Sequence, residues 1–598
     1  MRLYLLLIVV IAGCGLSAGT KPTEAPAPAS APNVIVIMTD DQGWGDFGFH
    51  GNPVLQTPAL DQFAAESTRL NTFYVHPVCT PTRSALMTGR YPQRTRAFDT
   101  WIGRAMLEPE EVTVAEVLRD EGWATGIFGK WHLGDCYPMR AMDQGFDESL
   151  VHLGGGIGQP SDPEGGEGKY TNPILLHNGE REQTQGYCTD VYFDQALGWM
   201  KEQSESDKPF FTYIATNAPH GPFHDVPEDL LKKYQAMDLS KAFAQPAEGH
   251  PLPKDFDADK LARIYAMIEN VDQNVAKLMQ GLEDLGIAEN TMVIFLVDNG
   301  PNTRRHVGGR RGMKSNVHEG GVRSPLWVRW PAGLQAGEGA DRVAAHIDLM
   351  PTILEACKVT SPAIAQLDGR SLMPLLQGHG DQWQDRSLII QAHRGDEGVR
   401  YHNFFLRTDE WKLVNASGFG REVMSAEPKF ELYDMQADPL ELHDLAATHP
   451  EIVDSLRAEY DHWFTDVSTT RADNWAPPSI IIGSPKAHEV TLTRQDWRKL
   501  TGAGWSKDSQ GEWHIEVLHP GPYGMRVRTT GISELSAVTL WCDDKQIAAT
   551  NGFSAANEVR FEGVFLPMGK SKLRVDLESM GKSVGPYQIE LRLNAIQR

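Results

Sequence analysis

Asn33-Val34-Ile35-Val36-Ile37-Met38-Thr39-Asp40-Asp41 is the stretch of this chain that decides its fold class. Its apolar, largely β-branched residues predict a strand that is buried on both faces, as in a parallel sheet. Similar strands are predicted at residues 124–128, 210–215 and 292–297. Helical patterns lie between these strands, at residues 57–70, 113–121, 190–203 and 259–285. Alternating strands and helices predict an α/β layered domain with a mostly parallel sheet.

The sequence pattern changes twice after this domain. From Arg386, short antiparallel strands are predicted at residues 388–391, 404–407, 412–414 and 430–433, followed by a helix at residues 452–465. We therefore expect a smaller α+β subdomain over residues 386–475, after an α/β domain over residues 33–385. Beyond Ala476-Pro477-Pro478, alternating patterns at residues 513–518, 525–529, 537–541 and 572–577 predict a β-sandwich over residues 476–598.

The N-terminus is typical of an export signal. Arg2 precedes an apolar run, residues 3–12, that is too short for a membrane span. The run ends in Ile11-Ala12-Gly13-Cys14, which resembles a bacterial lipobox with Cys14 as the lipidated first residue; ordinary secretion is the alternative. Residues 15–32 then form a flexible tether. We expect a lipoprotein of the cell envelope, in the periplasm or at the outer membrane or cell surface.

Charge and cysteine content exclude several classes of partner. The net charge of -23 argues against nucleic acid or an anionic membrane surface as a ligand. An anionic substrate therefore needs a locally basic pocket. The six cysteines include no CxxC or Cys/His zinc pattern. Export would permit a bridge between Cys136 and Cys188, and two buried free thiols are the alternative.

Acidic residues follow two of the predicted strands. Asp40 and Asp41 come after the first, and Asp298 and Asn299 come after the strand at residues 292–297. Either pair alone is typical of a helix cap or a turn. Together they offer hard oxygen donors at the carboxyl ends of strands, where α/β sheets bind ligands. Such donors suit Ca²⁺, which tolerates irregular shells, or Mg²⁺, and do not suit zinc.

Three further motifs carry basic side chains. The run from Gly129 to Gly134 contains Lys130 and His132, His220 follows Pro219, and Lys314 lies in a glycine-rich loop. Taken singly, they suit a surface turn, a structural histidine and a plain loop. Their joint occurrence, mostly at predicted strand ends, argues against all of these plain interpretations holding together.

The run Cys79-Thr80-Pro81-Thr82-Arg83, followed by Thr88-Gly89-Arg90, resembles the signature that marks a cysteine for conversion to formylglycine in type I sulfatases. The other motifs occur in the order seen in that family, and the resemblance extends over about residues 33–463. It implies an alkaline-phosphatase-like fold. It also implies a maturation partner, either a formylglycine-generating enzyme or an anaerobic sulfatase-maturating enzyme.

The resemblance assigns the metal site and the nucleophile. Asp40, Asp41, Asp298 and Asn299 would bind Ca²⁺ together with modified Cys79. The hydrated aldehyde at residue 79 would attack sulfur with one hydroxyl and expel sulfate with the other.

The remaining roles implied by the resemblance concern sulfate binding and proton transfer. Arg83 would hold the formylglycine hydrate, and Lys130 and Lys314 would contact sulfate oxygens. His220 would protonate the leaving alcohol, and His132 would take a proton from the remaining hydroxyl. Family members commonly place another polar residue between the motifs of His132 and His220. The segment around Gly154-Gly155-Gly156 offers no residue that we assign to it.

Substrate contacts beyond the sulfate are predicted from clusters of polar and aromatic residues. Basic side chains gather between two active-site motifs, at Arg304, Arg305, His306, Arg310 and Arg311. They suit a clamp for anionic groups of a glycan, or a solvated basic loop. Trp101, Arg104 and His224 are further candidates for a sugar subsite, although tryptophans more often lie in a core.

These observations predict a sulfatase that acts on sulfated carbohydrate. A phosphonate or phosphodiester hydrolase of the same superfamily is one alternative. A non-catalytic glycan-binding lipoprotein is another. The predicted sandwich has no catalytic constellation, and we weigh two roles for it: carbohydrate binding, and packing against the catalytic domain to shape the cleft.

Overall fold

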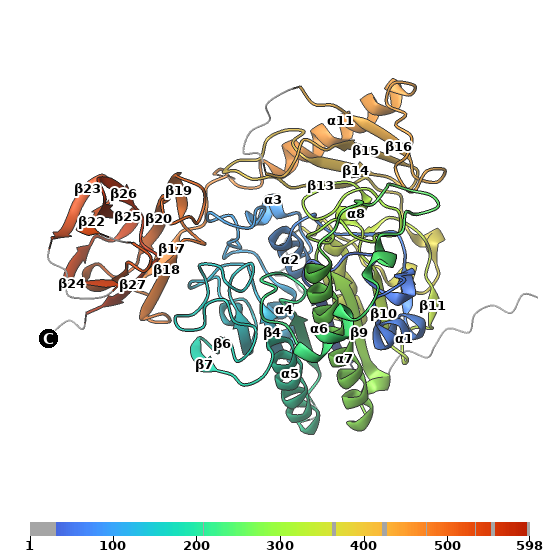
Figure 1. Ribbon diagram of the computed structural model, residues 1–598, viewed down its shortest axis with the longest axis horizontal. Coiled ribbons are helices and arrows are strands. Elements are labelled where there is room, and N and C mark those ends of the chain that lie inside the picture. The colour runs from blue at the N-terminus through green and yellow to red at the C-terminus, as the bar shows by residue number, and fades with distance from the viewer. Residues whose placement is uncertain are drawn as a thin grey trace, which may run out of the picture.

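The computed structural model describes residues 31–206, 208–360, 366–420, 427–473, 475–532, 534–551 and 557–594. The predicted lipobox cysteine Cys14 and most of the tether lie outside these residues. A ten-stranded sheet forms the centre of the molecule (Figure 1). Its strands, in spatial order, are β11 (Gly337–Glu338), β2 (Thr68–Leu70), β10 (Leu326–Arg329), β9 (Thr291–Val297), β1 (Asn33–Thr39), β8 (Phe210–Ala215), β4 (Ala124–Lys130), β5 (Glu148–His152), β6 (Ile174–His177) and β7 (Glu180–Gln183).

The five central strands, β9, β1, β8, β4 and β5, are parallel, and β10, β6 and β7 add antiparallel pairs at the two edges. The burial of both faces of strand β1 explains why its sequence is continuously apolar. Val34, Val36 and Met38 face one hydrophobic cluster, and Ile35 and Ile37 face another. Because successive side chains of a strand point to opposite faces, a strand with a core on each side has no polar face. The predicted fold class is confirmed.

Helices cover both faces of the sheet. One face packs against α2 (Cys79–Thr88), α4 (Val114–Asp120) and α9 (Leu349–Ala356). The other packs against α1 (Pro58–Glu66), α5 (Cys188–Glu205) and α7 (Ala258–Asp284). Shorter elements are β3 (Phe73–Tyr74), α3 (Pro92–Thr95), α6 (Glu228–Gln235), α8 (Glu319–Val322), β12 (Ala344–Ala345) and α10 (Met373–Leu376).

One predicted boundary is wrong. The helix predicted over residues 57–70 ends at Glu66, and residues 68–70 form β2, which pairs with β10 and β11. Thr68 and Leu70 are buried in the sheet, so tertiary pairing overrides the helical pattern there. The other helices named above from the sequence are found within about two residues of their predicted ends, as helix termini commonly vary.

A second, smaller sheet lies above the first in Figure 1, with α11 (Pro450–Val467) packed on it. Its antiparallel strands are β13 (Leu388–Gln391), β14 (Phe404–Arg407), β15 (Trp411–Asn415) and β16 (Glu431–Asp434). Lys412 of β15 is fully buried and lies 2.8 Å from carboxylate oxygens of both Glu319 and Glu441. This ion-pair cluster ties the small sheet to α8, which begins five residues after Lys314.

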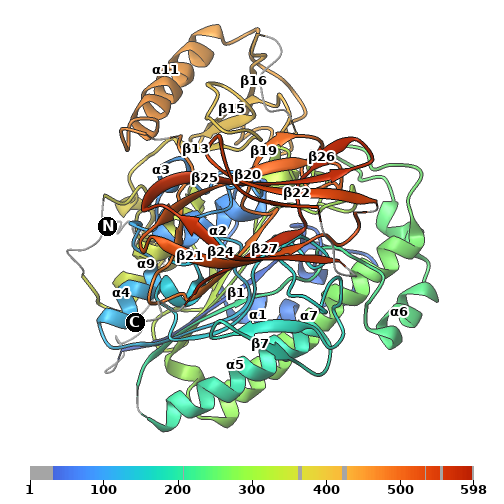
Figure 2. The same cartoon turned by 90° about the vertical axis from the view of Figure 1, so that its left-hand side faces the viewer.

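The C-terminal part of the chain forms two antiparallel-rich sheets that face each other (Figure 2). One contains β17 (Ile480–Ile482), β20 (Gln510–Val517), β25 (Gly569–Ser579), β22 (Leu535–Cys542) and β23 (Lys545–Thr550), with β19 (Arg498–Thr501) and β26 (Lys582–Val584) beside it. The other contains β18 (Glu489–Thr493), β27 (Gln588–Leu593), β21 (Gly521–Arg528) and β24 (Glu558–Leu566). The predicted sandwich is present, and the domain boundaries remain predictions.

The cysteines of the described residues are all free and buried. Cys136 lies in the hydrophobic cluster of the sandwich and Cys188 lies beneath the central sheet, so the bridge considered from the sequence does not form. Within the described part of the chain, no helix combines the length and the apolar character needed to cross a membrane.

Candidate active site

Four carboxyl ends of neighbouring parallel strands meet at one edge of the central sheet. Thr39 of β1 is paired with Val297 of β9, so Asp40 and Asp298, the next residues on each strand, are brought side by side. Strand β4 ends at Lys130, and β8 leads through a short turn to His220. The parallel sheet thereby gathers motifs that are up to 258 residues apart in the sequence.

The acidic residues form one buried cluster with Cys79. One ligand-type atom from each of Asp40, Asp41, Cys79 and Asp298 lies within 4.8 Å of the others. The backbone N–H of Asp41 donates to Asp298 Oδ1 at 3.0 Å, and Asn299 Nδ2 donates to Asp41 Oδ1 at 2.8 Å. Asp41 Oδ2 and Asn299 Oδ1 are buried, and neither has a hydrogen-bond partner among the residues that the structure describes.

These atoms fit a hard divalent cation. Buried carboxylate and amide oxygens that accept no hydrogen bond are costly unless a further positive group satisfies them. The donor set is oxygen-rich and irregular, which favours Ca²⁺ over zinc. Asp40, Asp41, Asp298 and Asn299 are therefore the residues that would hold the ion.

Three cations balance the three carboxylates. Lys130 Nζ lies 2.5 Å from Asp40 Oδ2, Lys314 Nζ lies 2.5 Å from Asp41 Oδ1, and Arg83 lies 2.9 Å from Asp298 Oδ2. Burial raises the pKa of Asp41, but the charges of Lys314 and His220 and its hydrogen bonds outweigh burial and hold that pKa well below its usual range. Burial and the charge of Asp40 raise the pKa of Asp298 to about 6.

Cys79 is the first residue of α2, and its environment keeps sulfur protonated. Its Sγ lies 3.4 Å from Asp40 Oδ1 and 3.4 Å from Lys314 Nζ. Burial, followed by the charge of Asp40, raises the pKa of the thiol to about 12, against the opposing effect of Lys130 and Lys314. A thiol with such a pKa is not a nucleophile near neutral pH. Among these side chains alone, an unmodified Cys79 therefore remains a protonated thiol.

Arg83 lies one turn further along α2 and is fully buried. It donates to the backbone carbonyl of Lys130 at 3.2 Å as well as to Asp298. Burial lowers the pKa of its guanidinium, but Tyr213 and Asp298 reverse the effect, so that the group stays charged. Arg83 thus joins the residue-79 helix to the metal-type cluster and to β4.

The two predicted catalytic histidines are both held close to this cluster as neutral rings. Burial lowers the pKa of His220 to about 4 despite Asp41, whose Oδ2 lies 3.6 Å from Nε2 of His220. Burial and the charge of Lys130 hold the pKa of His132 well below its usual range. His132 Nε2 lies 3.0 Å from the backbone carbonyl of Thr100, and its Nδ1 has no partner among the described residues.

Two adjacent glycines lie directly against these histidines. A Cβ at Gly155 would lie 2.7 Å from Cε1 of His132, and a Cβ at Gly156 would lie 2.6 Å from Nδ1 of His220. The same two positions approach the amide of Gln159, at 2.8 Å from Oε1 and 3.1 Å from Nε2 respectively. The glycine run therefore leaves room for both rings and places the Gln159 amide beside them.

The structure argues against a substrate role for Arg104 and changes the role of Trp101. Arg104 is 1% exposed and donates to the backbone carbonyls of Asp396 and Trp475. Trp101 has the guanidinium of Arg394 4.0 Å from its ring centre and packs edge-on against Trp505 of the sandwich. Both residues serve contacts between parts of the chain.

The basic loop is mostly engaged in contacts with the protein itself. Arg305 is buried against Asp46 at 2.7 Å, and Arg311 pairs with Glu431 at 2.9 Å. Arg310 stacks on Trp44, with 3.6 Å from its guanidinium carbon to the ring centre. Three of the five basic residues that the sequence suggested as a clamp, Arg305, Arg310 and Arg311, are therefore engaged within the protein.

Three other candidate subsite residues are exposed or half-buried. Arg304 is exposed and donates to the carbonyl of Pro251 at 2.8 Å. His306 is half-buried, with its Nε2 buried and without a partner among the described residues. His224 is exposed and lines a shallow surface depression with Lys260 and Arg263. Their predicted contacts with substrate remain predictions.

A mostly parallel sheet with carboxylates, lysines and histidines at its carboxyl edge defines an α/β protein with a candidate enzyme site at the place where such sheets bind ligands. The chain matches the sulfatase family over residues 32–359, and the C-terminal region of N-sulphoglucosamine sulphohydrolase over residues 312–463. It therefore belongs to the sulfatase family and is a sulfuric ester hydrolase. Neither match includes residues 464–598.

Two human relatives illustrate the similarity. Arylsulfatase A of Homo sapiens is 34% identical over 477 residues, which cover 72% of this chain and 87% of that protein. N-acetylgalactosamine-6-sulfatase of Homo sapiens is 31% identical over 485 residues, which cover 73% of this chain and 85% of that protein.

Solved structures share the fold. Ps i-CgsB in complex with k-i-k-neocarrahexaose superposes with a TM-score of 0.62 at 24% identity, over 75% of this chain and 94% of that one. BT4656 in complex with its substrate D-glucosamine-2-N,6-O-disulfate superposes with a TM-score of 0.59 at 22% identity, over 74% and 99%.

Two residues of the site were missed from the sequence. Gln159 follows the glycine run by three residues, and the run itself was the only signal. Gln495 lies in the sandwich, yet its Nε2 is 3.4 Å from Nε2 of His132. No local pattern points from residue 495 to an active site that is formed by residues 40–314.

We predict that Gly155→Ala lowers kcat by about tenfold or more, because the new methyl group must displace His132 and small misplacements of a catalytic group are costly. Gly198→Ala is the control, since Gly198 lies in α5 with nothing within 4 Å of the added methyl group. Steady-state kinetics and thermal unfolding of both variants test this. Unchanged kcat in Gly155→Ala would show that the ring position is not critical.

Proposed function

We propose that this protein hydrolyses sulfate esters of carbohydrates through a formylglycine that is made from Cys79 and acts beside a bound Ca²⁺. The observation that carries the proposal is the setting of Cys79. Its thiol is held protonated at the start of α2, within 3.4 Å of Asp40 and Lys314. A protonated thiol in this position does not serve as a nucleophile, whereas conversion of Cys79 to formylglycine would supply one. Its sequence context resembles the signature for that conversion.

The modified residue would supply two hydroxyls on one carbon, of which one attacks sulfur as the alcohol leaves and the other becomes a carbonyl as sulfate leaves. The ion, held by Asp40, Asp41, Asp298 and Asn299, would neutralise sulfate charge. The remaining roles, sulfate binding and proton transfer, are assigned to side chains near residue 79.

Lys130 and Lys314 bind sulfate oxygens in this proposal. Each now contacts one carboxylate of the cluster, at 2.5 Å. A divalent cation on the same carboxylates would weaken both lysine pairs and free the ammonium groups for an anion. Arg83 stays with Asp298 and holds the helix that carries residue 79. The two lysines would then form the locally basic pocket that an anionic substrate needs in a protein of negative net charge.

Proton transfer is divided between the two histidines. His220, which is neutral before the reaction, takes the proton of the residue-79 hydroxyl that attacks sulfur and passes it to the alcohol oxygen as the ester S–O bond breaks. His132 takes the proton of the residue-79 hydroxyl that becomes a carbonyl, as the bond from that carbon to the sulfate oxygen breaks. The bare Nδ1 of His132 is the atom that can accept this proton, since Nε2 faces a carbonyl oxygen.

The names of similar proteins support the carbohydrate part of the proposal. N-acetylgalactosamine-6-sulfatase acts on a sulfated sugar by its name, and two solved relatives were determined with sugars. Turnover of defined sulfated monosaccharides and carrageenan oligosaccharides, compared with an aryl phosphodiester, tests this choice. Preference for the phosphodiester would favour the alternative hydrolase.

We predict that protein matured in a competent host carries formylglycine at position 79 and that Cys79→Ala lacks sulfatase activity. Peptide mass spectrometry across residues 79–83, run beside an aryl sulfate assay, measures both. Fully active protein that contains only cysteine at position 79 would refute the mechanism.

Calcium binding has a readout that does not depend on activity. We predict that Ca²⁺ raises the thermal unfolding midpoint of the Cys79→Ala protein, because a ligand at about a hundredfold its Kd adds about 2.7 kcal/mol to the free energy of unfolding. The double variant Cys79→Ala/Asp41→Asn should lose most of this shift. Equal shifts in both proteins would place the ion elsewhere.

We also propose export and lipid anchoring through Cys14, on the basis of the lipobox-like run that ends there. Labelled palmitate should enter the full chain and not the Cys14→Ala variant, which should appear in the soluble fraction. Equal labelling of the two proteins would exclude Cys14 as the lipidated residue.

A further inference from the structure

The C-terminal sandwich is joined to the catalytic part of the chain by a shared hydrophobic core. The cluster between its two sheets also contains Met106, Cys136 and Met139. Charged pairs extend the contact, with Arg526 beside Glu164 at 2.5 Å and Arg528 beside Glu167 at 3.1 Å. The sandwich, which lies beside the catalytic part of the chain in Figure 1, is therefore packed against it and is not a separate module on a tether.

The connection between β18 and β19 reaches furthest into the catalytic part. The backbone carbonyl of Gln495 accepts from the N–H of Gly103 at 3.3 Å, and Arg498 donates to the carbonyl of Ile102. The side-chain Nε2 of Gln495 donates to the carbonyl of Thr100 at 2.9 Å. The segment from Thr100 to Gly103 is thus held along its length by one loop of the sandwich.

The carbonyl of Thr100 is also the partner of His132, at 3.0 Å from Nε2. A carbonyl oxygen only accepts, so Nε2 of His132 must carry the hydrogen and Nδ1 must be bare. The Gln495 amide is oriented by the same oxygen, and its nitrogen lies 3.4 Å from Nε2 of His132. Gln495 is 1% exposed, so the amide has no solvent-filled space in which to turn away.

We propose that Gln495 is a positioning residue of the active site: by holding the Thr100 carbonyl and closing the space beside the ring, it keeps His132 in the tautomer and orientation that leave Nδ1 free to accept a proton. The sandwich is then a wall of the active site. This inference rests on the proposed function, because it assigns His132 to the step in which sulfate is released.

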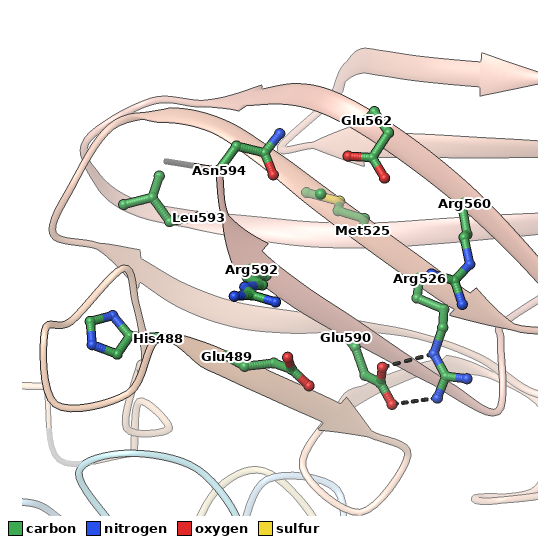
Figure 3. A pocket seen from close by; sticks show the side chains of 11 residues that line it. His488, Glu489, Met525, Arg526, Arg560, Glu562, Glu590, Arg592, Leu593 and Asn594 are labelled. Atoms are coloured by element: carbon green, nitrogen blue, oxygen red, sulfur yellow. Dashed lines mark hydrogen bonds and ion pairs between the residues drawn. The ribbon is translucent and has the colours of Figure 1, made fainter. Parts of the chain in front are cut away.

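The outer face of the sandwich offers less support for the alternative role in carbohydrate binding. Figure 3 shows a groove there that is lined by side chains of both charges, including Arg526, Arg560, Glu562 and Arg592. Arg526 is already paired with Glu590 at 2.6 Å. Among the residues that the structure describes, no Trp, Tyr or Phe lines this groove, so these residues offer no flat aromatic surface of the kind on which sugar rings commonly stack.

Gln495→Met in the full matured chain tests the proposal, since methionine keeps the volume and removes the hydrogen bond. We expect kcat to fall by about tenfold or more with KM little changed. Because alcohol release precedes the step assigned to His132, stopped-flow measurements should show a burst approaching about one alcohol per enzyme, larger than in the wild type. A crystal structure of the variant should show the His132 ring moved away from Thr100.

Gln510→Ala is the matched control. Gln510 is a buried glutamine whose side-chain bonds, to Val575 and Asp576, stay within the sandwich. It should lower the unfolding temperature without changing the burst. If Gln495→Met leaves the burst, kcat and the ring position unchanged, Gln495 does not position His132. A wild-type protein inactive on every sulfate ester would overturn the proposed function instead, and the ring position in the variant would still decide the present proposal.

Discussion

Three carboxylates and three cations meet at the carboxyl edge of the central sheet, and their pairing imposes the strictest constraint on this fold. Asp40, Asp41, Asp298, Lys130 and Arg83 are buried and Lys314 is partly exposed, and a buried charge without a partner would cost several kcal/mol. Each is paired within 3 Å, Lys130 with Asp40, Lys314 with Asp41 and Arg83 with Asp298. The parallel register of β1 and β9 has to be held to place Asp40 beside Asp298, and a core on each face of β1 holds it. In the proposed mechanism, a divalent cation bound to the carboxylates would free Lys130 and Lys314 to bind sulfate.

The small sheet and the sandwich both contact the segments that carry residues of the site. The small sheet reaches the glycine-rich loop of Lys314 through the buried ion pairs of Lys412 with Glu319 and Glu441. The sandwich reaches His132, which lies two residues past the end of β4, through the Thr100 carbonyl. In the proposed mechanism, the hydrogen-bond partner of the proton-accepting His132 is held by the sandwich, so proton transfer depends on the integrity of the sandwich. The sandwich would then matter to the reaction without contacting the substrate.

The sequence predicted the features that follow from local pattern. Strand β1 was predictable because both of its faces are buried, and the proximity of Asp40 and Asp298 was predictable because both follow strands of one parallel sheet. The signature around Cys79 indicated the sulfatase family through resemblance. The burial of Arg104 was not predictable, since a sequence does not show that this arginine lies against the carbonyls of residues 396 and 475. Gln495 was out of reach for the same reason, because its contact with His132 spans 363 residues and depends on how two domains pack. Gly155 matters through the absence of a side chain, which only the position of the His132 ring reveals.

The most direct test is a crystal structure of the matured protein with Ca²⁺ and a sulfate ester or sulfate bound. Our account predicts one cation among the oxygens of Asp40, Asp41, Asp298 and Asn299, with the ammonium groups of Lys130 and Lys314 turned from their carboxylates to the sulfate. A structure in which both lysines still pair with Asp40 and Asp41, with sulfate bound elsewhere, would contradict it.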